Sequence, residues 1–166
     1  MSKKYVLGID NGGTVTKAAI YDAQGRIHAL AQSRLDTLVP QPLFTERNID
    51  DFWQANVNAI RRCLEQSKID PSEIAALAIT GHGNGIYLAR KDGSAPRNGI
   101  ISTDGRAQSF VDTWLADPEF SSRVRSKTGA VVWAGQPVAL LAWIDANEPE
   151  IFDETDFVFA AKDYIR

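Results

Sequence analysis

The sequence predicts an α/β fold built around a mixed sheet flanked by helices, in which antiparallel strands come first and parallel strands follow. Three β-rich segments stand in succession near the beginning, and short hairpin-type connections at residues 11–13 and 22–25 join them. A long amphipathic segment comes next and leads into a continuous apolar run at residues 74–80. Such a run is typical of a strand that is buried on both faces and reached through a crossover helix.

The first half of the chain contains the meander and the long helix. Alternating apolar residues predict strands at 5–9, 15–21 and 26–33, which form an antiparallel meander. Asn48 is a favourable N-cap for the helix that follows, and we expect this helix to run for about 18 residues and to end near Ser67.

The second half of the chain alternates shorter elements. Its predicted strands lie at 86–93 and 157–161, and its predicted helices lie at 104–117, at 119–127 and from Pro137 onward. Proline suits the first turn of a helix because the N–H group that it lacks has no intrahelical partner there. No repeat, low-complexity tract or flexible linker interrupts this order, so the sequence predicts a single domain.

Composition and charge argue against several classes of protein. The 166 residues are 44% hydrophobic and 23% charged, as in an ordinary globular domain. The net charge of −3 gives no general attraction to nucleic acid or to anionic membranes. Cys63 is the single cysteine, so no intrachain disulfide can form, and no stretch approaches the ~18 apolar residues of a membrane span. We therefore expect a cytoplasmic protein whose partners include neither nucleic acid nor membrane.

The connection after the first strand contains the residue types of a phosphate-binding loop. A carboxylate at the end of a buried strand can hold Mg²⁺ directly or through water, and glycines let backbone N–H groups approach phosphate oxygens. Hydroxyl groups and a lysine add donors and charge. The residues in this arrangement are Asp10, Gly12, Gly13, Thr14, Thr16 and Lys17. On spacing alone, a hairpin turn in which Asp10 or Asn11 bonds its own backbone explains the pattern equally well.

Two other nucleotide-binding motifs do not fit the sequence. A P-loop opens a helix and requires Gly-Lys-Ser/Thr, a tripeptide that the chain lacks. The segment Gly-His-Gly-Asn-Gly at residues 81–85 superficially resembles a dinucleotide fingerprint. A strand is predicted after it, where that fingerprint requires a helix, so the pattern argues against NAD binding.

Several segments in order resemble the FGGY family of carbohydrate kinases, and the likeness covers essentially all 166 residues. GIDNGGTVTKAAIYDAQGRI is similar to the first phosphate loop of the sugar kinase, Hsp70 and actin superfamily, whose domains have a ribonuclease-H-like fold. FTERNIDDFWQANVNAIRRCL resembles the segment that leads into the family's first long helix. IAALAITGHGNGIYLARKDGSAPRNGIISTDGRA resembles the family's strand, substrate loop and D-x-R segment. TGAVVWAGQPVALLAWIDANEPEIF resembles its P-x-x-K-L-x-W region, and FAAKDYIR is a further match.

The sequence departs from the family pattern at three places. Leu140 stands where the signature usually has lysine, and Ser102 replaces an aromatic residue that commonly precedes the D-x-R segment. The small substrate loop, Gly-His-Gly-Asn-Gly, differs from that of D-xylulose and glycerol kinases. These changes resemble the L-xylulose/3-keto-L-gulonate kinase branch of the family.

The resemblance implies an ATP-dependent kinase that transfers the γ-phosphate to a hydroxyl of a ketopentose-like sugar, such as L-xylulose. Residues 1–166 would be the N-terminal, sugar-binding, ribonuclease-H-like domain of a longer kinase. The general base is expected beyond Arg166, so this segment alone would be inactive. A homodimer of the full-length protein is a further expectation.

The resemblance also assigns roles to individual residues. Asp10 would order the Mg²⁺ of MgATP through water, and the rest of the glycine loop would face the transferring phosphate. The residues expected to contact or shape the sugar pocket are His82, Asn84, Asp104 and Arg106. Simpler roles stay open for these residues: His82 can bond a loop carbonyl, Asp104 can cap the helix predicted to begin there, and Arg106 can pair with Asp104.

Two other functions remain as alternatives. A metal-dependent nuclease of the same fold would need several converging carboxylates and a basic face. A non-catalytic module that binds a nucleotide or a sugar is the second alternative. For Trp133, we expect the ring to pack in the core and not against the face of a sugar.

Overall fold

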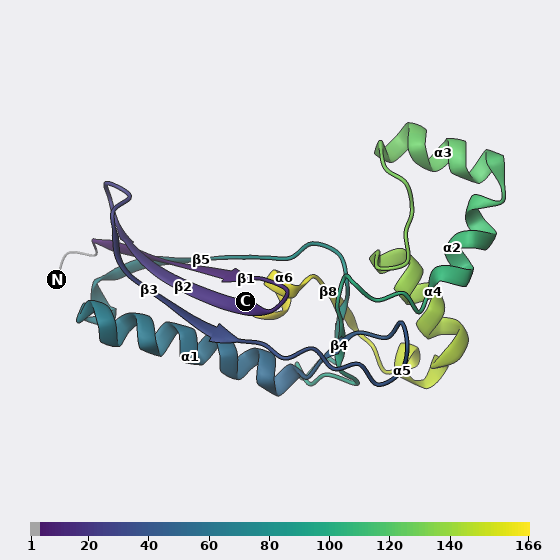
Figure 1. The fold of residues 1–166 in the computed structure, drawn as a ribbon. Coiled ribbons are helices and arrows are strands. Elements are labelled where there is room, and N and C mark those ends of the chain that lie inside the picture. The colour runs from purple at the N-terminus through teal and green to yellow at the C-terminus, as the bar shows by residue number, and fades with distance from the viewer. Residues whose placement is uncertain (1–3) are drawn as a thin grey trace. The chain divides into compact units, whose positions relative to one another are not determined.

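Residues 4–166 are described by the structure, a computed structural model, which begins with the predicted antiparallel meander (Figure 1). Strand β1 (Tyr5–Asn11) pairs with β2 (Val15–Asp22), and β2 pairs with β3 (Ile27–Arg34). Both pairings are antiparallel, which confirms the prediction. Each strand ends one or two residues beyond its predicted end because the pairing continues into the turn.

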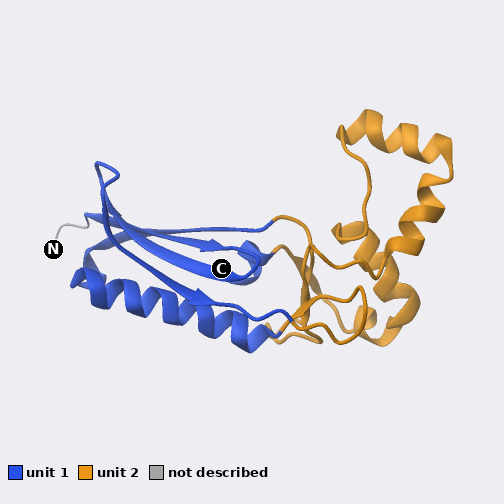
Figure 2. Ribbon diagram, in the orientation of Figure 1, with its two compact units in different colours: residues 1–37, 48–82, 161–166 blue, residues 38–47, 83–160 orange. Residues whose placement is uncertain are grey.

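The chain divides into two compact units (Figure 2). The first unit contains the residues up to Thr37 together with Asn48–His82 and Ala161–Arg166, and the second contains Leu38–Arg47 and Gly83–Ala160. The phosphate-loop candidates therefore belong to the first unit. Three of the four sugar-site candidates belong to the second.

The first unit is a four-stranded mixed sheet with a long helix on one face. Its strand order is β3-β2-β1-β5, and β5 (Ile74–Gly81) runs parallel to β1, as predicted. Helix α1 (Ile49–Ser67) packs on β2 and β3 (Figure 1). Asn48 caps the helix by accepting the N–H of Asp51 at 3.0 Å, which confirms its predicted role. The core of this unit contains Leu7, Ala18, Ile20, Ala29, Ala31, Ala59 and Cys63.

Strand β5 differs from its prediction in burial. Its continuous apolar sequence predicts burial on both faces, yet Leu77 is 50% exposed and most of the strand is exposed with it. The physical reason lies in the sheet order: β5 is an outer strand that pairs with β1 alone, while α1 covers β2 and β3. The 3₁₀ turn η1 (Pro71–Glu73) leads into this strand, and the short helix α6 (Ala161–Tyr164) completes the unit.

The second unit combines two small sheets with four helices. The antiparallel pairs join β4 (Glu46–Arg47) to β7 (Gly99–Ile100), and β6 (Tyr87–Ala89) to β8 (Phe157–Phe159). Its helices are α2 (Gln108–Leu115), α3 (Pro118–Thr128), α4 (Pro137–Asn147) and α5 (Pro149–Asp153). The core of this unit contains Ile86, Leu88, Ile100, Ala107, Val111, Val132, Ala139, Leu140 and Ile144.

Predicted boundaries of three elements that lie in this unit are corrected. The strand expected over 157–161 ends at Phe159, because helix α6 begins at Ala161. The helix expected from Asp104 begins at Gln108, because the side chain of Asp104 bonds backbone and arginine donors and caps no helix. The strand expected over 86–93 is limited to β6, since a turn held by the Gly93 N–H bond to the Arg90 carbonyl follows it. Within residues 4–166, no helix combines the length and the apolar character that crossing a membrane requires.

Candidate active site

Asp10 and Lys17 lie opposite each other on β1 and β2 and share the sheet face that α1 leaves uncovered. The strand register pairs them directly, and both side chains are exposed. Because side chains alternate across a strand, the buried Ile9 and Ala18 beside them face the helix. The sequence therefore places a carboxylate and an amine together on an accessible surface.

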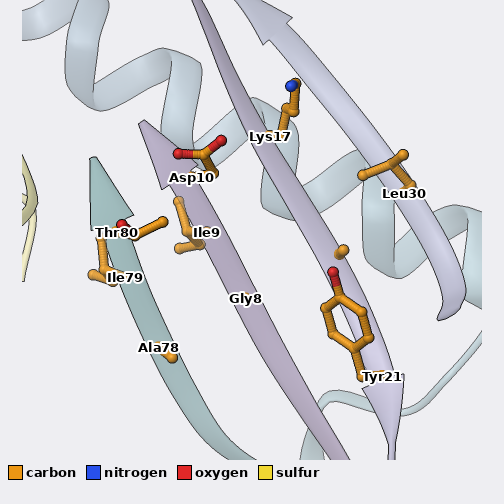
Figure 3. A pocket seen from close by; sticks show the side chains of 10 residues that line it. Gly8, Ile9, Asp10, Lys17, Tyr21, Leu30, Ala78, Ile79 and Thr80 are labelled. Atoms are coloured by element: carbon orange, nitrogen blue, oxygen red, sulfur yellow. The ribbon is translucent and has the colours of Figure 1, made fainter. Parts of the chain in front are cut away.

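This surface is hollowed along the strands. The hollow has a volume of about 350 Å³ and is floored by small residues, which include Gly8, Ala19 and Ala78. Figure 3 shows Asp10 and Lys17 toward one end, with Tyr21 farther along the strands. The polar groups thus gather at the end of β1 that enters the glycine loop.

The glycine loop between β1 and β2 is short and closely held. The N–H of Gly12 donates to the carbonyl of Val15 at 3.0 Å, and a Cβ on Gly12 would lie 3.0 Å from that same oxygen. This distance is shorter than most Cβ contacts, so the position favours glycine. Gly13 and Thr14 are exposed, and the carbonyl of Thr14 accepts the N–H of Leu35 at 2.9 Å. The loop therefore presents glycine backbone and a threonine hydroxyl to the surface.

Thr16 lies inside the protein, whereas its predicted contact with phosphate requires a hydroxyl at the surface of the loop. Its side chain is fully buried, and its hydroxyl donates to Oδ1 of Asn11 at 2.9 Å. Position 16 shares the helix-facing side of β2 with Ala18, so strand alternation turns it away from the loop surface. The structure does not bring the Thr16 hydroxyl together with Asp10 and Thr14.

His82 lies at the end of β5 and contacts the start of the glycine loop. Its N–H donates to the carbonyl of Asn11 at 2.8 Å, and its ring Nδ1 lies 3.2 Å from the same oxygen. A carbonyl oxygen only accepts, so Nδ1 carries the proton in this contact. The interpretation that His82 bonds a loop carbonyl is confirmed, and its contact with a sugar stays a prediction.

Asn84 occupies an exposed tight turn in the second unit. Its φ is 61°, a left-handed conformation that asparagine tolerates better than most residues, and Gly85 follows with φ 69°. The N–H of Gly85 donates to the carbonyl of Gly135 at 2.8 Å. A Cβ on Gly85 would lie 2.5 Å from the carbonyl of Ile100, so this position excludes larger residues. The turn thus holds the Asn84 amide at the surface.

Asp104 and Arg106 form a buried ion pair in the second unit. Neither side chain has exposed surface, and Oδ1 of Asp104 accepts Nε of Arg106 at 2.9 Å. The same carboxylate accepts the backbone N–H of Thr45 at 2.6 Å and that of Arg106 at 2.9 Å. The interpretation that Arg106 pairs with Asp104 is confirmed. Helix capping by Asp104 is wrong, because α2 has no side-chain cap.

Glu46 extends this pair into a network that the sequence did not identify. It accepts a hydrogen bond from Arg106 at 2.8 Å and pairs with Arg97, which also contacts Glu148. Burial raises the pKa of Glu46, but the Arg106 hydrogen bond and the charge of Arg97 outweigh it and hold the pKa below its usual range. In the sequence, Glu46 is a lone glutamate within FTERNIDD. No spacing or motif there indicates that it binds an arginine 60 residues away.

Aromatic rings enclose the central arginine of the network. The guanidinium of Arg106 lies 4.1 Å from the ring centroid of Phe44 and 5.0 Å from that of Trp143. Trp133 is 42% exposed, so its expected core position is wrong. Cys63 is buried within the first unit, where burial raises the pKa of its thiol and makes it a packed side chain.

The chain offers one exposed carboxylate to a metal at the glycine loop. Among residues 4–166, no three His, Cys, Asp or Glu side chains come together in a way that could hold a metal ion. Mg²⁺ commonly keeps several waters and binds through one or two carboxylates plus substrate phosphates, so Asp10 fits a metal that arrives with its phosphate ligand.

Comparisons with known proteins agree on one family. A sequence model described as the FGGY family of carbohydrate kinases, N-terminal domain, matches residues 5–166. The chain is 33% identical over 162 residues to the "Probable L-xylulose kinase" of Haemophilus influenzae, covering 98% of this chain and 33% of that protein. It is 34% identical over 165 residues to the L-xylulose/3-keto-L-gulonate kinase of Escherichia coli, covering 98% of this chain and 32% of that protein.

The solved structures agree with the sequence relatives. A ligand-bound xylulose kinase from Lactobacillus acidophilus superposes with a TM-score of 0.88 at 25% identity, over 98% of this chain and 32% of that one. This likeness confirms the predicted ribonuclease-H-like fold of the sugar kinase superfamily. The chain spans about a third of the length of the relatives that it matches.

Proposed function

Because the chain belongs to the FGGY family of carbohydrate kinases, we propose that the full-length protein transfers the γ-phosphate of ATP to a hydroxyl of a ketopentose-like sugar, such as L-xylulose. The observation that carries this proposal is the exposed carboxylate of Asp10 at the entrance to a glycine loop, with Lys17 opposite it on the next strand. The loop joins two antiparallel strands, which distinguishes it from a P-loop.

The loop residues act on the phosphates of ATP. Phosphoryl transfer depends mainly on positioning and on charge neutralisation, since there is little covalent chemistry for the protein to perform. Gly12 and Gly13 let the backbone approach the transferring phosphate, and the Thr14 hydroxyl and the Lys17 amine supply a donor and a charge. Asp10 would hold the Mg²⁺ of MgATP through water. When bound, the metal neutralises charge on the phosphate oxygens.

The sugar is held by residues that follow β5. The exposed amide of Asn84 donates to and accepts from sugar hydroxyls, which suits a polyol substrate. Asp104 and Arg106 shape the sugar pocket indirectly, since their buried side chains fix the backbone of residues 45 and 104–106. The general base is proposed to lie beyond Arg166. A homodimer and a cytoplasmic location belong to the same proposal.

The nuclease alternative lacks support. It requires several carboxylates that converge on metal ions, and residues 4–166 contain no such group. The relatives reported above are named as kinases. A module that binds a sugar or a nucleotide without turnover remains the outcome to be excluded by assay.

The proposal is tested with the full-length protein, MgATP and a panel of ketopentoses, by measuring the release of ADP. Asp10→Ala should lower turnover by about 10²–10³-fold while the circular dichroism spectrum stays unchanged, because the role of Asp10 is local. Asp36→Ala is the matched control, since Asp36 is an exposed aspartate of the same unit. No ADP release with any sugar would refute the kinase function, and unfolding of Asp10→Ala would favour the hairpin-turn interpretation.

A further inference from the structure

The residue between Asp10 and Gly12 is buried although its neighbours reach the surface. Asn11 has 0% exposure and is the last residue of β1. It is paired with Thr16 of β2 on one side and with Gly81 of β5 on the other. Because Asn11 precedes the glycine loop directly, any shift of its backbone moves both the Asp10 carboxylate and the loop N–H groups.

Three hydrogen bonds from two strand ends hold Asn11. The Thr16 hydroxyl donates to its side-chain Oδ1 at 2.9 Å. Its backbone carbonyl accepts both the N–H and the ring Nδ1–H of His82, at 2.8 and 3.2 Å. The side chain and the main chain of Asn11 are therefore fixed independently, one by β2 and the other by the residue that ends β5.

Close packing leaves Asn11 little room to move. A Cβ added to Gly81 would lie 3.3 Å from both the Cβ and the carbonyl oxygen of Asn11, and 3.4 Å from the backbone nitrogen of Lys162. The two distances to Asn11 are tighter than ordinary van der Waals contact. The absence of a side chain at Gly81 lets β5 lie close to Asn11 and lets the start of α6 lie close to β5.

We propose that Thr16 and His82 are positioning residues that hold the glycine loop in place through Asn11. The proposal rests on the kinase function proposed above, because it makes this junction a determinant of phosphoryl transfer. A misplacement of about 1 Å can cost on the order of 10²-fold in rate when chemistry depends on alignment. Neither side chain has to touch ATP or the sugar for this effect. Loss of either contact therefore lowers kcat and leaves the binding of the sugar nearly unchanged.

Four variants separate this role from direct contact with a substrate. Thr16→Val removes the hydroxyl and keeps the shape, and Thr16→Ser restores the hydroxyl. For His82 the two amides report on different ring atoms: asparagine places a donor near the position of Nδ1, and glutamine places one near the position of Nε2. His82→Asn therefore preserves the bond to Asn11. His82→Gln loses this bond and keeps a donor near the position of Nε2, from which a sugar ligand would reach the substrate.

The first measurement is the steady-state kinetics of the full-length protein. Thr16→Val and His82→Gln should lower kcat about tenfold or more with the sugar KM within about twofold of wild type. Thr16→Ser and His82→Asn should stay within about threefold of the wild-type kcat. A sugar KM raised by His82→Asn and spared by His82→Gln would overturn the assignment and make His82 a sugar ligand.

The second measurement does not depend on activity. Amide hydrogen exchange of the peptide that spans residues 10–17 should be about tenfold faster in Thr16→Val than in Thr16→Ser, because local opening frees the loop. A wild type that phosphorylates no sugar but shows this exchange pattern would refute the kinase function and leave the positioning of the loop in place. An active wild type, with kcat and exchange unchanged in both Thr16→Val and His82→Gln, would refute the positioning role.

Discussion

Replacing Arg106 by methionine tests whether this arginine stabilises the fold through its buried ion pair or binds the sugar. The side chain of Arg106 donates two hydrogen bonds to Asp104 and one to Glu46, and it has no exposed surface. Methionine keeps much of the volume between the aromatic rings and removes the charge. Asp104, which is equally buried, is then left without a counter-charge.

The expected loss of stability follows from these contacts. Three hydrogen bonds to charged groups, at about 1.5–3 kcal/mol each, set an upper limit of roughly 4.5–9 kcal/mol. Asp104 keeps the N–H groups of Thr45 and of residue 106, and Glu46 keeps Arg97, so part of the loss is recovered. The remaining cost is about 3–5 kcal/mol, the range found when one partner of a buried pair is removed.

Urea unfolding followed by tryptophan fluorescence measures this loss, since Trp143 lies beside the guanidinium. With a slope of about 2 kcal/mol per M, the midpoint should fall by roughly 1.5–2.5 M. Arg90→Met is the matched control: Arg90 pairs with Glu154 at the surface, where removal should cost about 1 kcal/mol or less. A loss below about 1 kcal/mol in Arg106→Met, together with a sugar KM raised more than tenfold, would refute the structural interpretation.

Two further predictions concern the second unit. Gly99→Ala would place a Cβ 2.5 Å from the ring of the fully buried Tyr87, and it should lower the free energy of unfolding in urea by about 1–3 kcal/mol. Gly83→Ala is the control, because no atom lies within 4 Å of its Cβ, and it should cost less than half as much. Equal losses in the two variants would contradict the packing argument. Because the folded state lowers the pKa of Glu46, this group stabilises the protein above its ordinary value of 4.5 and ceases to do so as the pH falls through the lowered pKa. Glu46→Gln should therefore be less stable than wild type at pH 7 and approach it in acid, and a stability difference that does not change with pH would contradict the ion pair.

The sequence predicts local structure better than it predicts burial. The meander, the N-cap at Asn48 and the start of α4 at Pro137 depend on neighbouring residues, and all three are confirmed. The burial of β5 depends on what lies beside it in space, which an apolar run does not specify. The alternating pattern over residues 86–93 also misplaces the end of β6, because hydrogen bonds between Arg90 and Ser94 and between Gly93 and Arg90 close a turn there.

The sequence identified the candidate residues of the second unit more readily than their contacts. The D-x-R resemblance points to Asp104 and Arg106 but does not specify their contact, which the structure shows to be a buried ion pair. Glu46 was missed because its partners lie far along the chain and no regular spacing connects them. Ion pairs between distant segments form only when the chain folds, so a single sequence contains no local signal for them.

The glycine loop shows how strand alternation can divide residues of one motif between two roles. Asn11 is two residues beyond the buried Ile9 and therefore faces the core, and Thr16, paired with it across the hairpin, does the same. Asp10 and Lys17 have the opposite parity and face outward. Counting from the apolar residues would have made this distinction from the sequence alone. Within Asp-Asn-Gly-Gly-Thr-Val-Thr-Lys, the outward residues are thus available to bind phosphate and metal, and the inward pair is available to hold them in place.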